Sequence, residues 1–128
     1  MILDLNGMHI SGTERRQAVA HLKRGLKTIE SKGWCQNTFQ DSNKRVCAWG
    51  AVGVREGDLS NKLSAVIPTV NLLIAGIKKV DPKARLRADG EEGRIFGWND
   101  RRGRKVGQVK RAFKHAIKIG QGLKPVRG

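Results

Sequence analysis

The stretch TERRQAVAHLKRGLKTIESKG, residues 13–33, carries the most regular hydrophobic pattern of the chain. Apolar residues recur along it every three or four positions, which is the spacing of one face of a helix. This stripe consists of Val19, Leu22, Leu26 and Ile29. Thr13 suits the N-cap, and Gly33 suits the position after the last turn. We therefore expect an amphipathic helix that starts at residues 12–13 and stops at Gly33, with Arg16, Lys23 and Lys27 on its opposite side.

Two later apolar runs predict further helices. The first covers Thr69–Val80 and places Pro68 in its opening turn, where a missing N–H costs least. Its inward residues are Val70, Leu73, Ile74 and Ile77. The second extends from about Arg104 to Ile119, and Gly120 is expected to stop it. Its apolar face consists of Val106, Val109, Phe113, Ala116 and Ile117.

The remaining segments decide between a purely helical and a mixed fold. DSNK, residues 41–44, is typical of a turn, and the residues after it fit a returning strand or a short helix equally well. ARLRADGEEGRIFGW, residues 84–98, favours a small hairpin. We expect a mainly α protein, a bundle of three to four helices with one or two short β-hairpins, while an α+β arrangement stays open. One compact domain would cover residues 1–119, followed by a basic flexible tail over residues 120–128.

Charge is the strongest functional signal in the sequence. The chain carries 26 basic and 11 acidic residues, a formal net charge of +15. The first 60 residues contribute +3 and the rest contribute +12, and no acidic residue follows Asp100. Repulsion of this size destabilises a folded chain, so a polyanionic partner is a natural explanation. A solvated basic surface that serves solubility is the alternative.

The basic residues form two clusters in the sequence. RRGRK, residues 101–105, stands just before the last predicted helix, whose free N–H groups also favour anions, and more cations follow along that helix. This cluster consists of Arg101, Arg102, Arg104, Lys105, Lys110, Arg111, Lys114 and Lys118. The other cluster flanks the middle helix and consists of Lys78, Lys79, Lys83, Arg85 and Arg87. If the fold joins them, they make a surface for several phosphates. Trp98 would add a stacking surface if exposed, although we favour core packing for it.

Cys35 and Cys47 are the only cysteines, twelve positions apart. A structural zinc site needs two close ligand pairs, which the chain lacks, so we predict no metal and no cofactor. A hairpin turning near Asp41 would bring the two cysteines together, whereas a turn centred between Ser42 and Asn43 would offset them, and a reducing cytosol further disfavours a disulfide. Flanking Trp and Val residues predict buried, unreactive thiols. We expect both cysteines to be structural and the protein not to be an enzyme, a cysteine-dependent enzyme being the less favoured alternative.

Three short motifs follow one another along the chain: W-C-Q at residues 34–36, C-A-W-G-A at residues 47–51 and W-N-D at residues 98–100. In this order they resemble a domain-of-unknown-function family of small bacterial and phage proteins, from Gly33 to Ile119. The resemblance implies a shared framework made of Trp34, Cys47, Gly50, Ala51, Trp98 and Asn99. It implies a cytosolic protein carried by phages or other mobile elements, and it names no reaction. The chain departs from the family pattern in its excess of lysine and arginine.

These features together predict a non-enzymatic binding protein in the cytoplasm of a bacterial host cell. Its expected partner is the backbone of DNA or RNA, or a nucleoprotein complex of the host, and interference with host defence is the role that a phage origin suggests. The alternatives are an inhibitor or adaptor that docks on an acidic host protein, and a pocket that sequesters a small anionic nucleotide. No apolar run is long enough to span a bilayer, so no membrane partner is expected. The oligomeric state stays open.

Overall fold

The computed structural model describes residues 2–3, 9–10, 12–38, 40–51, 63–84, 95 and 97–122. Two-residue strands β1 (Ile2–Leu3) and β2 (His9–Ile10) pair antiparallel at the start of the chain. The helices are α1 (Gly12–Lys32), α2 (Ala48–Ala51), α3 (Leu63–Val80) and α5 (Val106–Gly122). The predicted mainly helical fold is confirmed. Most of the hairpin predicted for residues 84–98 lies outside the described residues.

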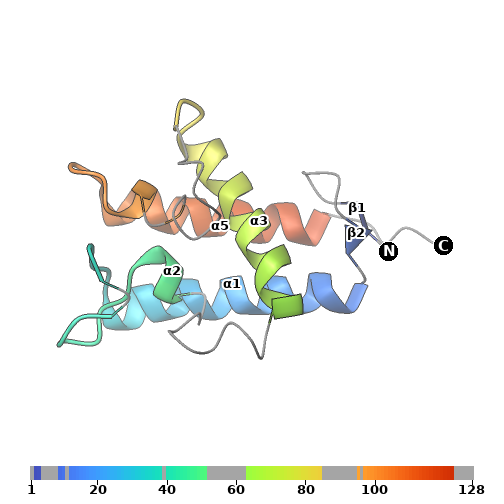
Figure 1. Ribbon diagram of the computed structural model, residues 1–128, viewed down its shortest axis with the longest axis horizontal. Coiled ribbons are helices and arrows are strands. Elements are labelled where there is room, and N and C mark those ends of the chain that lie inside the picture. Colours follow the sequence, from blue (N-terminus) through green and yellow to red (C-terminus); the bar gives the residue numbers. More distant parts are fainter. Residues whose placement is uncertain are drawn as a thin grey trace.

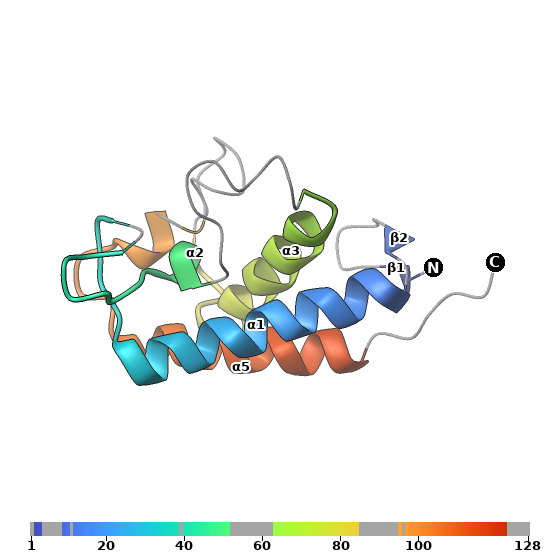
Figure 2. The same cartoon turned by 90° about the horizontal axis from the view of Figure 1, so that it is seen from below.

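Three long helices make two layers. α1 and α5 lie side by side and antiparallel, because α1 runs from right to left in Figure 1 and α5 returns from left to right. α3 crosses both on one side, as Figure 2 shows, and the core lies between α3 and the α1–α5 pair. The largest fully buried side chains include Leu22 of α1, Leu73 and Ile77 of α3, and Phe113 of α5. On the opposite side of the α1–α5 pair, described residues such as Lys23 and Lys118 are exposed.

α1 has the expected limits. It ends at Lys32, and Gly33 follows with a φ of +99° while its N–H donates to the Ile29 carbonyl over 2.9 Å. A positive φ at this position favours glycine, so the predicted stop is confirmed. The open choice after the 41–44 turn is also settled, because Val46 makes only isolated bridges and α2 begins at Ala48.

Glycines bring the long helices unusually close. A Cβ on Gly76 of α3 would clash with the Ala112 carbonyl of α5, and a Cβ on Gly120 would come within 2.7 Å of Cγ2 of Val19. Gly120 therefore corrects a prediction: it is a buried packing position inside α5, and the helix continues to Gly122. Glycine marks helix ends and close helix contacts alike, and only the fold distinguishes them. Residues 120–122, assigned to a tail, are helical, and residues 123–128 lie outside the described residues.

The predicted position of Pro68 in the first turn of its helix is also wrong. α3 starts at Leu63, so Pro68 lies inside the helix and not in its first turn. Because proline has no backbone N–H, it cannot donate the helical hydrogen bond to the Ser64 carbonyl, and this loss normally disfavours proline inside a helix. The following turns bury Val70, Leu73 and Ile77 almost completely, and burial of each such side chain contributes about 2 kcal/mol. Tertiary packing thus outweighs the local cost of the proline.

Candidate anion-binding site

A buried amide connects the three sequence motifs. Asn99 is fully buried, and its Oδ1 accepts hydrogen bonds from Trp34 Nε1 over 2.7 Å and from the Ala48 N–H over 2.9 Å. Its Nδ2 donates to the Cys35 carbonyl over 3.2 Å and to Asp100 Oδ1 over 2.9 Å. Because every hydrogen-bonding atom of this amide is satisfied, Asn99 is a structural centre. We call Asn99 and these four partners the Asn99 framework.

The loop that starts with Asn99 is fastened to the segment after α1. Gln36 Nε2 donates to the carbonyls of Asn99 and Arg101, each over 3.0 Å. The Asn37 N–H donates to Asp100 Oδ1 over 2.8 Å. Most hydrogen-bond partners of Asn99 and Asp100 lie more than fifty residues away in the chain, so the framework fixes where the RRGRK run begins.

The two thiols belong to the scaffold. Both cysteines are free and buried. Burial raises the pKa of Cys47 to about 11, and burial together with the nearby Asp41 carboxylate raises the pKa of Cys35. Both thiols are therefore protonated at neutral pH and poor nucleophiles. Cys47 Sγ accepts a hydrogen bond from the Gly50 N–H over 3.2 Å, which shapes α2. Within the described ranges no group of three His, Cys, Asp or Glu side chains is placed to hold a metal ion.

Arg104, which the sequence assigns to a basic cluster for phosphates, has a buried side chain. Its side chain is 5% exposed, and its guanidinium lies 4.0 Å above the ring centre of Trp98. Nε donates to the Trp98 carbonyl over 2.8 Å and Nη1 to Gln108 Oε1 over 3.4 Å, while Nη2 lies 3.6 Å from Asp81 Oδ2. Trp98 is itself 5% exposed and donates to Asp81 through Nε1. Trp98 is thus a core residue, as favoured, and offers no stacking surface.

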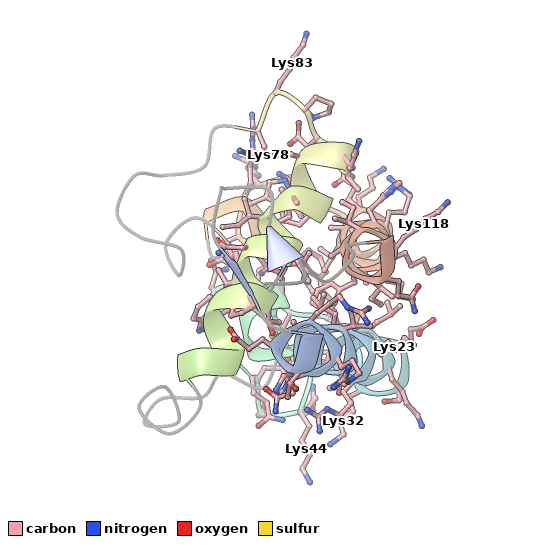
Figure 3. The ribbon with its side chains drawn as sticks, turned by 90° about the vertical axis from the view of Figure 1, so that its right-hand side faces the viewer. Lys23, Lys32, Lys44, Lys78, Lys83 and Lys118 are labelled. Atoms are coloured by element: carbon pink, nitrogen blue, oxygen red, sulfur yellow. The ribbon has the colours of Figure 1, made fainter. Side chains whose placement is uncertain are left out.

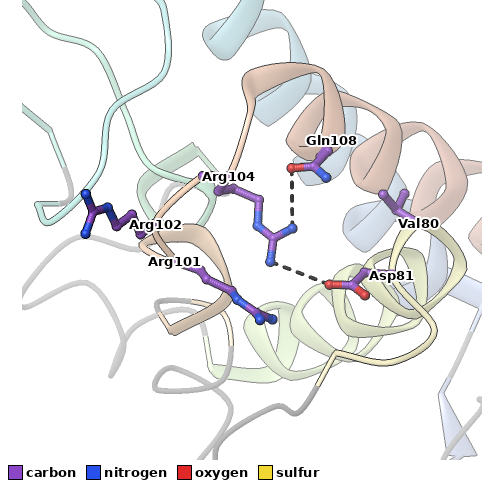
Figure 4. A pocket seen from close by; sticks show the side chains of 7 residues that line it. Val80, Asp81, Arg101, Arg102, Arg104 and Gln108 are labelled. Carbon is purple, nitrogen blue, oxygen red and sulfur yellow. Dashed lines mark hydrogen bonds and ion pairs between the residues drawn. The ribbon is translucent and has the colours of Figure 1, made fainter.

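A hollow of about 290 Å³ lies between the end of α3 and the loop before α5 (Figure 4). It is lined by Val80, Asp81, Arg101, Arg102, Gly103, Arg104 and Gln108. Val80 and Asp81 directly follow Lys78 and Lys79 in the chain, so the hollow brings the RRGRK run beside the end of α3, although no described cation of the second cluster lines it. The turn that carries the arginines is closed by the Arg104 N–H, which donates to the Arg101 carbonyl over 3.0 Å. Gly103 has a φ of +86° there, a conformation that glycine adopts readily.

The other predicted cations are distributed over two sides of the molecule. Lys105, Arg111, Lys114 and Lys118 are exposed and Lys110 is half-buried, all at or along α5. Lys78, Lys79 and Lys83 are exposed at the end of α3, and Figure 3 shows Lys78 and Lys83 well away from Lys118. Arg85 and Arg87 lie outside the described residues.

α1 adds cations that the predicted site did not include. In Figure 3, Lys23 and Lys118 both point away from α3, on the exposed side of the α1–α5 pair. Helical spacing places Arg16 and Lys27 on the stripe of Lys23, and Lys110 and Lys114 on the stripe of Lys118. We call this surface the basic face, and it consists of Arg16, Lys23, Lys27, Lys110, Arg111, Lys114 and Lys118. The acidic residue Glu30, one helical turn after Lys27 on α1, marks the end of the basic face. The polar stripe of α1 was visible in the sequence, but its pairing with α5 was not.

The comparisons with known proteins place the chain in a family without a known activity. Residues 13–119 match DUF6197, a family of unknown function, and the chain belongs to this family. Comparison of this chain with the curated proteins and with the solved structures found no match. Among the helices that the structure describes, none is long and apolar enough to cross a membrane.

Proposed function

We propose that this protein is a non-enzymatic binding protein that engages the phosphate backbone of a nucleic acid through its basic face. The observation that carries the proposal is that the cations on α1 and α5 lack acidic partners among the described residues and that several of them are exposed. Lys23, Lys114 and Lys118 are exposed, and no ion pair joins any cation of the basic face to an acidic residue in the described part of the chain. Their charge is therefore available to a partner.

The spacing of these cations supports a polyanionic partner. Four residues of α-helix span about 6 Å, and packed helix axes lie about 8–10 Å apart. The basic face thus presents two rows of positive charge, in which Lys23 and Lys27 on α1 and successive lysines among Lys110, Lys114 and Lys118 on α5 lie about 6 Å apart along the helix, within a Debye length of about 8 Å at physiological salt. Such rows repel each other until an anion neutralises them. A polyphosphate backbone does so without any base-specific contact.

The buried thiols and the satisfied Asn99 amide bear on the choice between binding and catalysis. A nucleophilic cysteine needs a thiolate and a base within hydrogen-bond reach, whereas burial keeps both thiols of this chain protonated. A binding role agrees better with these properties. We further propose that the protein acts in the cytoplasm of a bacterial host, on behalf of a phage or mobile element, against a nucleic acid or nucleoprotein of host defence.

The test is the affinity for short DNA and RNA strands as a function of salt. Binding that releases counterions from six or more phosphates weakens about a thousandfold between 50 and 200 mM salt. A flat salt dependence, or no binding at low salt, would contradict the proposal. A pull-down from lysate, with and without nuclease, distinguishes nucleic acid binding from the alternative of docking on an acidic host protein. Partners that survive nuclease treatment would favour docking on an acidic protein.

A further inference from the structure

The hollow beside α5 carries an excess of positive charge. Three arginines and one aspartate line it, which gives a net charge of +2. Asp81 and Arg104 offset each other, because Asp81 Oδ2 lies 3.6 Å from Arg104 Nη2 and also accepts the Trp98 indole N–H over 3.3 Å. The uncompensated charge therefore belongs to Arg101 and Arg102, which are exposed and have no ion pair with any described residue.

Arg104 also has an unmet hydrogen-bonding requirement at this hollow. Its Nη2 is buried and has no hydrogen-bond partner in the described part of the chain, and 3.6 Å to Asp81 is too long for a good hydrogen bond. Burial lowers the pKa of Arg104, and the positive charge of Arg101 lowers it further, against the effect of Asp81. An anion between these two guanidinium groups would relieve their repulsion and could accept from Nη2.

The size and surroundings of the hollow restrict the anion. Its volume of about 290 Å³ is at the small end of the range of about 300–1,000 Å³ that is typical of small-molecule pockets and has room for a phosphate group. A phosphate monoester has a charge of about −1.5 to −2 at pH 7 and three acceptor oxygens, which matches a net charge of +2. A phosphodiester within a strand has only one charge. The last turn of α3 bounds one side of the hollow, which suits the end of a strand better than a strand that continues.

We infer that the hollow formed by Arg101, Arg102, Arg104 and the start of α5 binds a phosphate monoester, namely the terminal phosphate of a nucleic acid strand. Arg101 binds its oxygens and Arg104 is the fixed donor behind it, while Arg102, whose side chain points away from Arg104 in Figure 4, adds positive charge at the rim. The inference takes from the proposed function that the protein binds a nucleic acid strand, whose terminal phosphate would occupy the hollow. The positive end of the α5 dipole, where Gln108 lines the hollow, adds to the attraction.

The experiment compares one single-stranded oligonucleotide with a 5′-phosphate, with a 3′-phosphate and with hydroxyl groups at both ends, each labelled internally. We expect one phosphorylated end to bind roughly tenfold more tightly than the hydroxyl ends, the effect of one charge-assisted hydrogen bond. The double variant Arg101→Gln/Arg102→Gln should lose this preference, so that it binds the phosphorylated and hydroxyl-ended strands with equal affinity. The matched variant Lys114→Gln/Lys118→Gln should bind all three strands more weakly and keep the preference.

Equal affinity of the wild-type protein for all three ends would overturn the inference, as would a preference that survives in the Arg101→Gln/Arg102→Gln variant. Adenosine monophosphate that binds as tightly as the phosphorylated strand would identify a free nucleotide as the ligand and overturn the strand-end assignment. Amide shifts of residues 101–108 on titration with inorganic phosphate report on the hollow alone. Shifts without binding of any strand would refute the proposed function and support the phosphate site, whereas their absence would count against the site.

Discussion

The Asn99 framework and the basic face use polar side chains in opposite ways. Both polar atoms of the Asn99 side-chain amide have partners inside the protein, whereas the cations of the basic face have no acidic partner among the described residues. The RRGRK run contains both kinds of residue, because Arg104 is built into the protein and Arg101 and Arg102 are exposed. Residue type alone therefore does not reveal function. What distinguishes the two regions is whether the protein itself satisfies the polar group.

The largest effect on stability is expected from Asn99→Ala. The substitution removes the partners of Trp34 Nε1, the Ala48 N–H and the Cys35 carbonyl at a fully buried position. Each buried group left unsatisfied costs about 1–3 kcal/mol, so the free energy of unfolding should fall by about 4 kcal/mol. Urea denaturation measures this loss. Asn43→Ala, at an exposed position whose backbone N–H alone bonds Asp41, should change stability by less than about 0.5 kcal/mol. Equal losses would contradict the framework.

Arg104→Gln and Arg102→Gln remove the same charge from the same run. The first loses the bond to the Trp98 carbonyl and the contact with the Trp98 ring, and we expect it to destabilise the protein by about 2 kcal/mol. The second removes an exposed side chain and should leave the free energy of unfolding almost unchanged. Thermal or urea unfolding of the pair separates structural from surface arginines. If the two variants lose the same stability, the buried role of Arg104 is wrong.

The cysteines should behave as core residues. With a pKa of about 11 against an ordinary value of 9.0, the Cys47 thiolate at pH 8 is about a hundredfold rarer than in the unfolded chain. Alkylation of Cys47 should slow by at least that factor on folding, as mass spectrometry with and without urea would show. Because this pKa is raised, the native state keeps a proton that the unfolded chain releases. Its stabilising effect is full below about pH 9 and disappears as the pH rises through 11. Rapid alkylation of the folded protein would indicate a reactive thiol.

Asp41 should give the smallest effect. Burial acts to raise its pKa, but hydrogen bonds from the N–H and guanidinium of Arg45 and from the Asn43 N–H lower it below 3.8 overall. A lowered pKa stabilises the fold above the unfolded value and loses this effect as the pH falls through the folded value. The melting temperatures of wild type and Asp41→Asn should therefore differ at about pH 6 and converge in stronger acid. A difference independent of pH would assign the effect to something other than the carboxylate charge.

The sequence predicted features that depend on local pattern. The stripe of α1, its end at Gly33 and the core position of Trp98 follow from helical periodicity and residue type, and the structure confirms them. It missed features that depend on distant partners. Asn99 bonds Trp34 and Ala48, which are 65 and 51 residues away, and the ion pair of Arg104 is with Asp81. Similarly, Gly120 packs against Val19 of the other helix in its layer, so local propensity alone suggested a helix end.

The basic face could not be predicted from the sequence either, because it combines residues of two helices that are far apart in the chain. The cations of α5 form a visible four-residue repeat, but the contribution of Lys23 requires knowing that α1 and α5 are antiparallel neighbours (Figures 1 and 3). Lys32 and Lys44 are also exposed lysines, yet Figure 3 shows them pointing to a different side of the molecule. Their charges provide a matched control for the claim that position, and not total charge, determines binding.

The most direct test is the salt dependence of nucleic acid affinity for Lys114→Gln/Lys118→Gln and for Lys32→Gln/Lys44→Gln. The two variants have the same net charge, and all four substitutions are at exposed positions, so both should fold normally. If the basic face binds the backbone, the first variant should reduce the slope of log affinity against log salt by about 0.7 for each lost contact with single strands. The second should keep the wild-type slope. Equal slopes for the two variants would contradict the central claim that the α1–α5 surface is the nucleic acid interface.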